Sequence, residues 1–265
     1  MALSPNSPFS LTPDPTLLFE TPAIRTILFK AVYVCEGRQG LTAIMGEVGL
    51  GKSTILRALH ARISARPEFT TAFLPSPNFS SDFAMLKAIA GEFELPPRRS
   101  MLAQENELRE YLVGLLGADR TAVIFIDEAQ RLTGKQMELI RVLTNLETNK
   151  VKLVQIVLSA QRELENKLKD PSKRAIASRI FLPSFLSPMS LPEAESMLAF
   201  RCEKHGIKNP FPAPAAKAIY DASKGNPRNI LKIAAAAYAL AAGSGMAAVP
   251  AEAIPDIATE AMLDV

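Results

Sequence analysis

Residues 45–54, "MGEVGLGKST", have the residue types and the spacing of a loop that holds a polyphosphate. Gly46 is followed after four residues by Gly51, Lys52 and Ser53, which is the P-loop pattern. Backbone N–H groups at a helix start converge on phosphate oxygens, and glycines leave room for that approach. Lys52 is predicted to reach the terminal phosphates and Ser53 to ligate Mg²⁺. The predicted nucleotide-binding residues of the loop are Gly46, Glu47, Val48, Gly49, Leu50, Gly51, Lys52, Ser53 and Thr54.

A second chemical group follows the apolar run in "TAVIFIDEAQ", residues 121–130. Asp127 is predicted to hold Mg²⁺ through water, and Glu128 to orient and deprotonate the attacking water. The alternative is that the two acids only cap the next helix, a frequent role for acids at a helix start. The P-loop upstream favours the catalytic interpretation, in which Glu128 is the residue that makes a nucleotide-binding protein a hydrolase.

The elements that must position these residues alternate along the first part of the chain. Apolar, β-branched runs predict strands over 41–45, 69–75, the residues before Asp127, 152–160 and 180–183, with helices between them. This order predicts an α/β fold with a parallel sheet flanked by helices. From Ser190 onward only helices are predicted, each bounded by Pro or Gly. The expected divisions are an extended arm at 1–20, an α/β domain at 21–187, a helical lid at 188–245 and a tail at 246–265.

Composition narrows the class of protein further. With 265 residues, 48% hydrophobic and 22% charged, the chain can bury a real core. Cys35 and Cys202 have no ligand-type spacing, so neither zinc nor a disulfide framework is indicated, and a cytoplasmic location is expected. The N-terminus lacks the pattern of a secretory signal. The alanine-rich run at 233–249 predicts a packed helix and no membrane insertion.

The combination of "GEVGLGKST", "VIFIDEAQ" and "PFSLTPDP" near the start resembles an AAA+ ATPase of the ExeA/GspA-type group. That group is similar to the transposition ATPases MuB, TniB and TnsC. The resemblance covers most of residues 7–240. It implies a P-loop AAA+ domain with a five-stranded parallel sheet, a small helical lid, ATP and Mg²⁺ as ligands, and ATP hydrolysis stimulated by oligomerisation and DNA.

The resemblance also implies roles for polar residues outside the two motifs. Gln161, or Ser159, would be the sensor that hydrogen-bonds the γ-phosphate or the attacking water. In "IASRIFLPSF" Arg179, with Arg174 as the second choice, would be the finger that reaches the neighbouring subunit, unless it only pairs with an acid on its own surface. In "KGNPRNI" Arg228 would contact the γ-phosphate from the lid.

The sequence favours the first of three roles for the hydrolysis and keeps the other two as alternatives. The first is a transposition regulator that forms a ring or helical filament on duplex DNA, independently of sequence, and delivers it to a transposase. The second is a secretion-assembly ATPase, and the third a nucleotide-gated switch with little turnover. The net charge of +3 does not by itself indicate nucleic-acid binding, and the sequence contains no helix-turn-helix or zinc-binding pattern. The candidate DNA contacts, for each of which taken singly a solvated surface charge is the favoured interpretation, are Arg98, Arg99, Lys135, Arg141, Lys150 and Lys152.

Overall fold

The computed structural model describes residues 7–262, which fall into two compact units. The first, here the α/β unit, comprises Pro22–Glu47 and Lys52–Leu186. The second, the helical unit, comprises Val48–Gly51 with the described parts of 1–21 and of 187–265. Most of the loop between Gly46 and Lys52 is therefore grouped with the helical unit.

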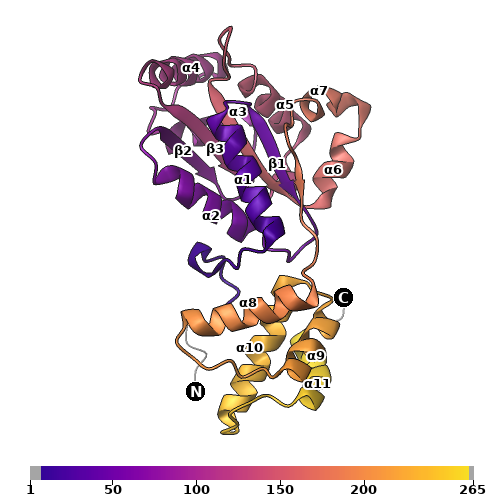
Figure 1. Ribbon diagram of the computed structural model, residues 1–265. Helices are drawn as coiled ribbons and strands as arrows, with labels where there is room; N and C mark the ends of the chain where they lie inside the picture. Colours follow the sequence, from indigo (N-terminus) through magenta and orange to yellow (C-terminus); the bar gives the residue numbers. More distant parts are fainter. Residues whose placement is uncertain (1–6, 263–265) are drawn as a thin grey trace. The chain divides into compact units, whose positions relative to one another are not determined.

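The α/β unit is built on a five-stranded parallel sheet with the strand order β2-β3-β4-β1-β5. Parallel strands need crossover connections, and helices supply them here (Figure 1). The predicted α/β fold with a five-stranded parallel sheet is confirmed. The strands are β1 Leu41–Met45, β2 Phe69–Leu74, β3 Thr121–Ile126, β4 Val154–Ala160 and β5 Ser184–Phe185. The helices of this unit are α1 Pro22–Glu36, α2 Lys52–Ser64, α3 Asp82–Glu92, α4 Met101–Gly117, α5 Gly134–Leu143, α6 Arg162–Leu168 and α7 Arg174–Ala177.

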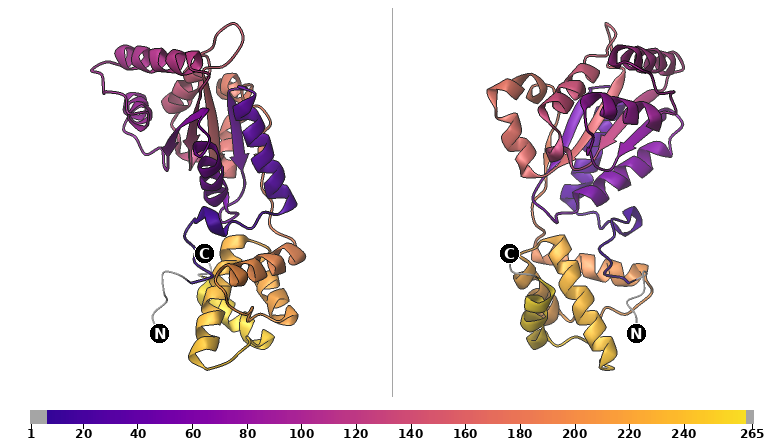
Figure 2. Two further views of the ribbon diagram at one scale, coloured as in Figure 1. Left: turned by 60° about the vertical axis from the view of Figure 1, so that its left-hand side comes forward. Right: turned by 180° about the vertical axis from the view of Figure 1, so that it is seen from behind.

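Helices cover both faces of this sheet. Alternate sheet residues, such as Ile124 and Ile156, join a core with α3 to α7, whereas α1 and α2 contact the strands from the other face (Figure 2). Strands β1, β3 and β4 are buried along their whole length, which is why they are continuous apolar runs. Caps fix the helix starts: the hydroxyl of Ser81 accepts from the backbone N–H of Ala84 at the start of α3.

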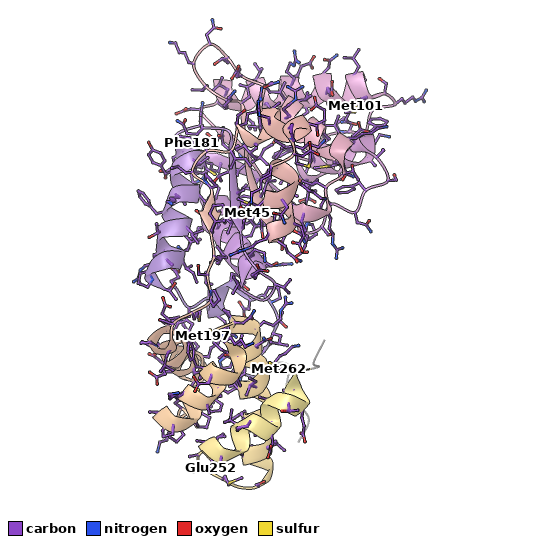
Figure 3. All side chains as sticks on the ribbon, turned by 90° about the vertical axis from the view of Figure 1, so that its right-hand side faces the viewer. Met45, Met101, Phe181, Met197, Glu252 and Met262 are labelled. Carbon is purple, nitrogen blue, oxygen red and sulfur yellow. The ribbon has the colours of Figure 1, made fainter. Side chains whose placement is uncertain are left out.

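The fifth strand differs from its prediction. A strand was expected over 180–183, but β5 is Ser184–Phe185, and Ile180 makes only an isolated bridge with Leu41. Leu182 has a positive φ of 49°, and Pro183 has no backbone N–H to donate. The ladder is therefore interrupted between Ile180 and β5. Phe181, labelled in Figure 3, lies in this interruption and is partly exposed.

The helical unit has its own core. Its helices are α8 Leu191–Lys204, α9 Ala213–Ser223, α10 Pro227–Gly243 and α11 Ile254–Ala261. The segment from 246 was expected to be a tail. Instead, Ile254 is completely buried, and Ile257 and Ala258 join it in the core with α9 and α10. Their i, i+3, i+4 spacing puts all three on one face of α11. Residues 263–265 of the expected tail lie outside the described residues.

The described part of the expected arm docks on the helical unit. Phe9 is 1% exposed, and its ring centroid lies 5.3 Å from that of Phe211 and 5.6 Å from that of Tyr238. The buried Arg201 donates to the backbone carbonyls of Pro8 and Ser10 at 3.4 and 3.3 Å. Phe9 therefore anchors the start of this segment, and Phe19 contacts Phe200 of α8 with ring centroids 5.7 Å apart. Residues 1–6 lie outside the described residues. Over 7–262, no helix combines the length and apolarity needed to span a bilayer.

Candidate nucleotide site

The P-loop follows β1 at the carboxyl edge of the sheet, and it closes around the ammonium of Lys52. The Nζ of Lys52 donates to the carbonyl oxygens of Gly46 and Glu47 at 2.9 and 2.7 Å. The side chain is 7% exposed, and it stands at the start of α2, whose first turn has no acidic residue. Gly49 and Gly51 both have φ of 85°, which non-glycine residues rarely adopt. A buried cation at a helix N-terminus whose first turn carries no acidic residue fits a polyphosphate.

The acid pair begins directly after β3 at the same edge. Asp127 is 4% exposed, and its Oδ1 accepts the backbone N–H of Glu128 at 2.9 Å. Glu128 has left-handed backbone angles, φ 54° and ψ 35°. Its Oε2 accepts from the Nε2 of Gln130 at 2.6 Å. The strand order places β4 between β1 and β3, so the loop and the acids flank the end of β4.

Both candidate sensors lie at that end of β4. Ser159 pairs in register with Ile44 of β1, and by strand alternation its side chain is on the same sheet face as Asp127. The Oγ of Ser159 is completely buried and has no hydrogen-bond partner among the described residues. Gln161 is the N-cap residue of α6, and its side chain makes no capping bond. Gln161 and Ser159 therefore remain alternatives.

Residues that the sequence prediction missed join these motifs. The Oε1 of Gln130 accepts the backbone N–H of Gln161 at 3.0 Å. Arg162 forms an ion pair with Glu47 of the P-loop, Nε to Oε1 3.1 Å, between two exposed side chains. Lys167 donates to the backbone carbonyls of Gln130 and Leu132. In the sequence, Gln130 of "DEAQ" was the signal that could have pointed to these contacts, but its partners become known only from the tertiary fold.

A magnesium ion at this edge would use few protein ligands. Within residues 7–262 no cluster of three or more His, Cys, Asp or Glu side chains is arranged for a metal. Mg²⁺ in nucleotide sites is held by one or two protein ligands together with substrate phosphates and water. Ser53, in the first turn of α2, and Asp127 fit that pattern as the two expected protein ligands.

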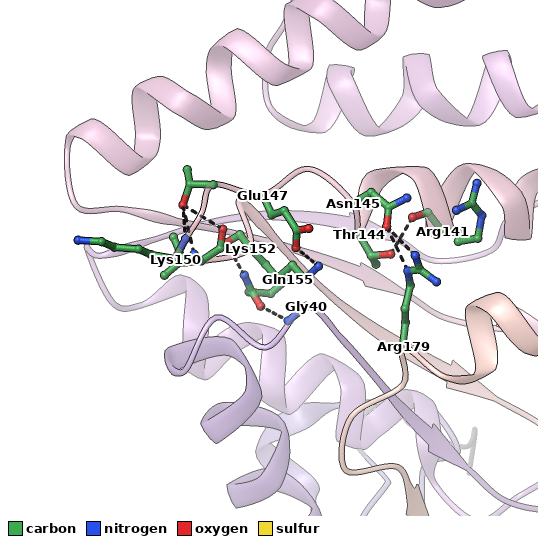
Figure 4. Close-up of polar contacts among 11 residues, drawn as sticks. Gly40, Arg141, Thr144, Asn145, Glu147, Lys150, Lys152, Gln155 and Arg179 are labelled. Atoms are coloured by element: carbon green, nitrogen blue, oxygen red, sulfur yellow. Dashed lines mark hydrogen bonds and ion pairs between the residues drawn. The ribbon is translucent and has the colours of Figure 1, made fainter.

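Arg179 lies at the opposite, amino edge of the sheet. The next residue, Ile180, bridges Leu41, the first residue of β1. The guanidinium donates from Nε and Nη2 to Oδ1 of Asn145, at 3.1 and 2.8 Å (Figure 4). Its Nη1 donates to the carbonyl of Ala175. A pocket of about 240 Å³ beside it is lined by Arg179, Lys152 and their neighbours. Arg174, the second choice, is exposed at the start of α7.

Arg228 lies in the first turn of α10 in the helical unit, where its side chain is exposed. Asn226 caps this helix by accepting the backbone N–H of Arg228 at 3.1 Å. Within the same unit, Asn226 donates to the carbonyl of Val48 at 2.8 Å, and the N–H of Arg228 donates to the carbonyl of Gly49 at 3.1 Å. The helix that carries Arg228 thus contacts the middle of the P-loop.

The six candidate DNA contacts are not gathered in one cluster. Lys135 is in the first turn of α5, which follows the carboxyl edge, whereas Lys150 and Lys152 precede β4 at the amino edge. Three of the six are neutralised locally, in the ion pairs Arg98–Glu107, Arg141–Glu138 and Lys152–Glu147. Arg99, Lys135 and Lys150 are exposed.

Comparisons with known proteins agree with this arrangement. A model of the AAA domain matches residues 35–168. General secretion pathway protein A of Aeromonas hydrophila is 33% identical over 226 residues, which are 84% of this chain and 41% of that protein. The chain thus spans about two fifths of the length of that relative.

Two solved structures share the fold at low sequence identity. The Aeropyrum pernix ORC2 protein in its ADPNP–ADP complexes has a TM-score of 0.71 at 16% identity, covering 97% of this chain and 72% of that one. The Aeropyrum pernix ORC1 protein in complex with DNA has a TM-score of 0.65 at 17% identity, covering 92% and 66%. The P-loop, the acid pair behind β3 and the matched model over half of the sequence together show that the chain belongs to the AAA domain family.

Proposed function

We propose that the protein binds ATP with Mg²⁺ and hydrolyses it at the carboxyl edge of the sheet. The observation that carries this proposal is the placement of the P-loop and the acid pair on either side of the end of β4. Lys52 and the loop amides bind the phosphates, and Ser53 and Asp127 hold the metal. Glu128 takes the proton of the attacking water, with Gln161 or Ser159 as the sensor.

The position of Arg179 supports completion of the site between subunits. The guanidinium is at the amino edge of the sheet, whereas the P-loop of the same chain follows the carboxyl end of β1. An arginine supplied from a neighbour stabilises transition-state charge by a factor on the order of 10³ to 10⁵ where it is used. We therefore propose that ATP assembles the chain into an oligomer in which Arg179 enters the site of the next subunit.

A mixing experiment tests hydrolysis and assembly together. Lys52→Ala loses phosphate binding, and Arg179→Ala loses the finger while keeping ATP affinity. Each variant alone is expected to have little activity, whereas an equimolar mixture regains part of it, because an intact Arg179 then faces an intact Lys52. Phosphate release is measured across protein concentrations, with Arg174→Ala as the matched variant from the same segment. An inactive mixture, with wild-type activity per subunit independent of concentration, would refute the finger in trans.

Two observations bear on the role of the hydrolysis. The 33% identity with General secretion pathway protein A favours assembly of a secretion machine. The ORC1 protein in complex with DNA shares the fold, and Arg99 and Lys150 are exposed for phosphate contacts, which supports the DNA-bound transposition regulator as the second candidate. In both roles Arg228, whose helix contacts Val48 and Gly49, would report the nucleotide state. A switch with little turnover would use the same contacts.

A further inference from the structure

The side chain of Gln130 bridges the acid pair and the start of α6. We infer that Gln130 is a positioning residue that holds the carboxylate of Glu128 and makes hydrolysis depend on the position of residue 161. This inference rests on the proposed function, because it assigns Gln130 a part in the same reaction.

The side-chain amide of Gln130 binds a hydrogen-bond acceptor with its nitrogen and a donor with its oxygen. Its Nε2 donates to Oε2 of Glu128 at 2.6 Å, and its Oε1 accepts the backbone N–H of Gln161 at 3.0 Å. A carboxylate only accepts and a backbone N–H only donates. A flipped amide would place acceptor against acceptor and donor against donor, so these partners fix its orientation.

Glu128 is a residue whose carboxylate needs such a support. Its backbone is left-handed, φ 54° and ψ 35°, a conformation that persists in a non-glycine residue only where its surroundings hold it. Asp127 holds its backbone N–H at 2.9 Å, and Gln130 holds Oε2. Among the described residues no donor contacts the Oε1 of Glu128, so this oxygen can accept a proton from water while Oε2 is held by Gln130.

The other end of the bridge is anchored to α6. Lys167 of α6 donates to the backbone carbonyls of Gln130 and Leu132, and thus ties the acid segment to this helix. Arg162, the first residue of α6, pairs with Glu47 of the P-loop. A displacement of residue 161 therefore reaches the carboxylate of Glu128 through one side chain. Contacts at the γ-phosphate and activation of water are coupled by Gln130.

Two substitutions separate this role from simple packing. Gln130→Met keeps the length of the side chain and removes both hydrogen bonds. Gln130→Glu keeps the shape and the acceptor for Gln161, but it replaces the donor by a carboxylate beside Glu128. Because a mispositioned catalytic group costs up to about 100-fold in rate, we expect kcat to fall about 10- to 100-fold in both. ATP affinity, measured by titration calorimetry, is expected to stay within about twofold.

The matched control is Gln104→Met. Gln104 in α4 is also bonded at both amide ends, to the N–H of Arg98 at 2.7 Å and the carbonyl of Pro96 at 3.3 Å, and it is not part of the candidate site. It is expected to lower the melting temperature while leaving kcat per folded protein unchanged. Wild-type kcat in Gln130→Met would overturn the inference, because that variant removes both hydrogen bonds of Gln130 without adding a charge beside Glu128. Absence of hydrolysis in the wild type would instead overturn the proposed function.

Discussion

At the residue scale, the two candidate sensors, Ser159 and Gln161, differ in burial. The hydroxyl of Ser159 is buried without a partner among the described residues, and an unpaired buried hydroxyl costs about 1–3 kcal/mol of folding stability. Gln161 is half-buried at the N-cap of α6, with its backbone N–H bound by Gln130. Gln161 directly follows the last residue of β4, at the edge of the sheet where the sensor must meet substrate.

We therefore predict that alanine substitutions separate the two residues. Ser159→Ala is expected to raise the melting temperature slightly, because it removes an unsatisfied hydroxyl, and to leave kcat within about twofold. Gln161→Ala is expected to lower kcat at least tenfold with little change in ATP affinity, since it removes contacts made in the transition state. Phosphate release and thermal unfolding of both variants check this. A loss of kcat in Ser159→Ala alone would make the buried hydroxyl the sensor.

At the element scale, residues 7–12 of the N-terminal segment are anchored by Phe9. Phe9 fills a place in the core of the helical unit between Phe211 and Tyr238, and the buried guanidinium of Arg201 binds the carbonyls on either side of it. Burial lowers the pKa of Arg201 from its usual range. The charge of Asp14 and the two carbonyl partners offset this burial in part, whereas the Nε of Arg201 has no hydrogen-bond partner among the described residues.

Phe9→Ala is predicted to release this segment from the helical unit. Truncation of a buried phenylalanine costs about 3–5 kcal/mol, and it removes the ring contacts of residues 7–12 with Phe211 and Tyr238. Hydrogen exchange of these amides and proteolysis between residues 7 and 21 are expected to accelerate. The control is Leu11→Ala in the same segment, where the side chain is 50% exposed. Equal protection in both variants would mean that Phe9 is not the anchor.

Elements also show the limits of prediction from sequence. The P-loop, the buried strands and the Ser81 cap are visible because each is a local pattern of neighbouring residues. The Gln130–Gln161 bond joins residues far apart in the chain, and its existence depends on β3 and β4 being adjacent. The packing of α11 against α9 and α10 could not be predicted, because hydrophobic periodicity shows which face of a helix is apolar but not which helices that face contacts. The fold and the two motifs were therefore predictable, and the links between them were not.

At the scale of the whole molecule, the formal charge of +3 makes assembly the condition for holding DNA. A few exposed cations per subunit, among them Arg99 and Lys150, give weak phosphate contacts. Subunits aligned along one duplex add these contacts, so that collective binding becomes strong. A role in secretion does not require binding to duplex DNA.

For the DNA role, we predict binding that requires ATP or a non-hydrolysable analogue and ignores sequence. If six or more phosphates are neutralised, affinity falls by about 10³ or more between roughly 50 and 200 mM salt. Arg98→Glu with Arg99→Glu is expected to weaken binding and spare basal hydrolysis, with Lys217→Glu in the helical unit as the control. Filter binding measures this. No binding at any salt concentration would favour the secretion-type role or the nucleotide-gated switch.

The most direct test of the central claim, that ATP is hydrolysed at the carboxyl edge of the sheet, is phosphate release by Glu128→Gln beside the wild type. The account predicts that this variant binds ATP with near wild-type affinity, because Lys52 and the P-loop are intact. It also predicts that turnover stops and that the ATP-bound assembly accumulates. Hydrolysis by Glu128→Gln at the wild-type rate would remove Glu128 from the role of base and contradict the account.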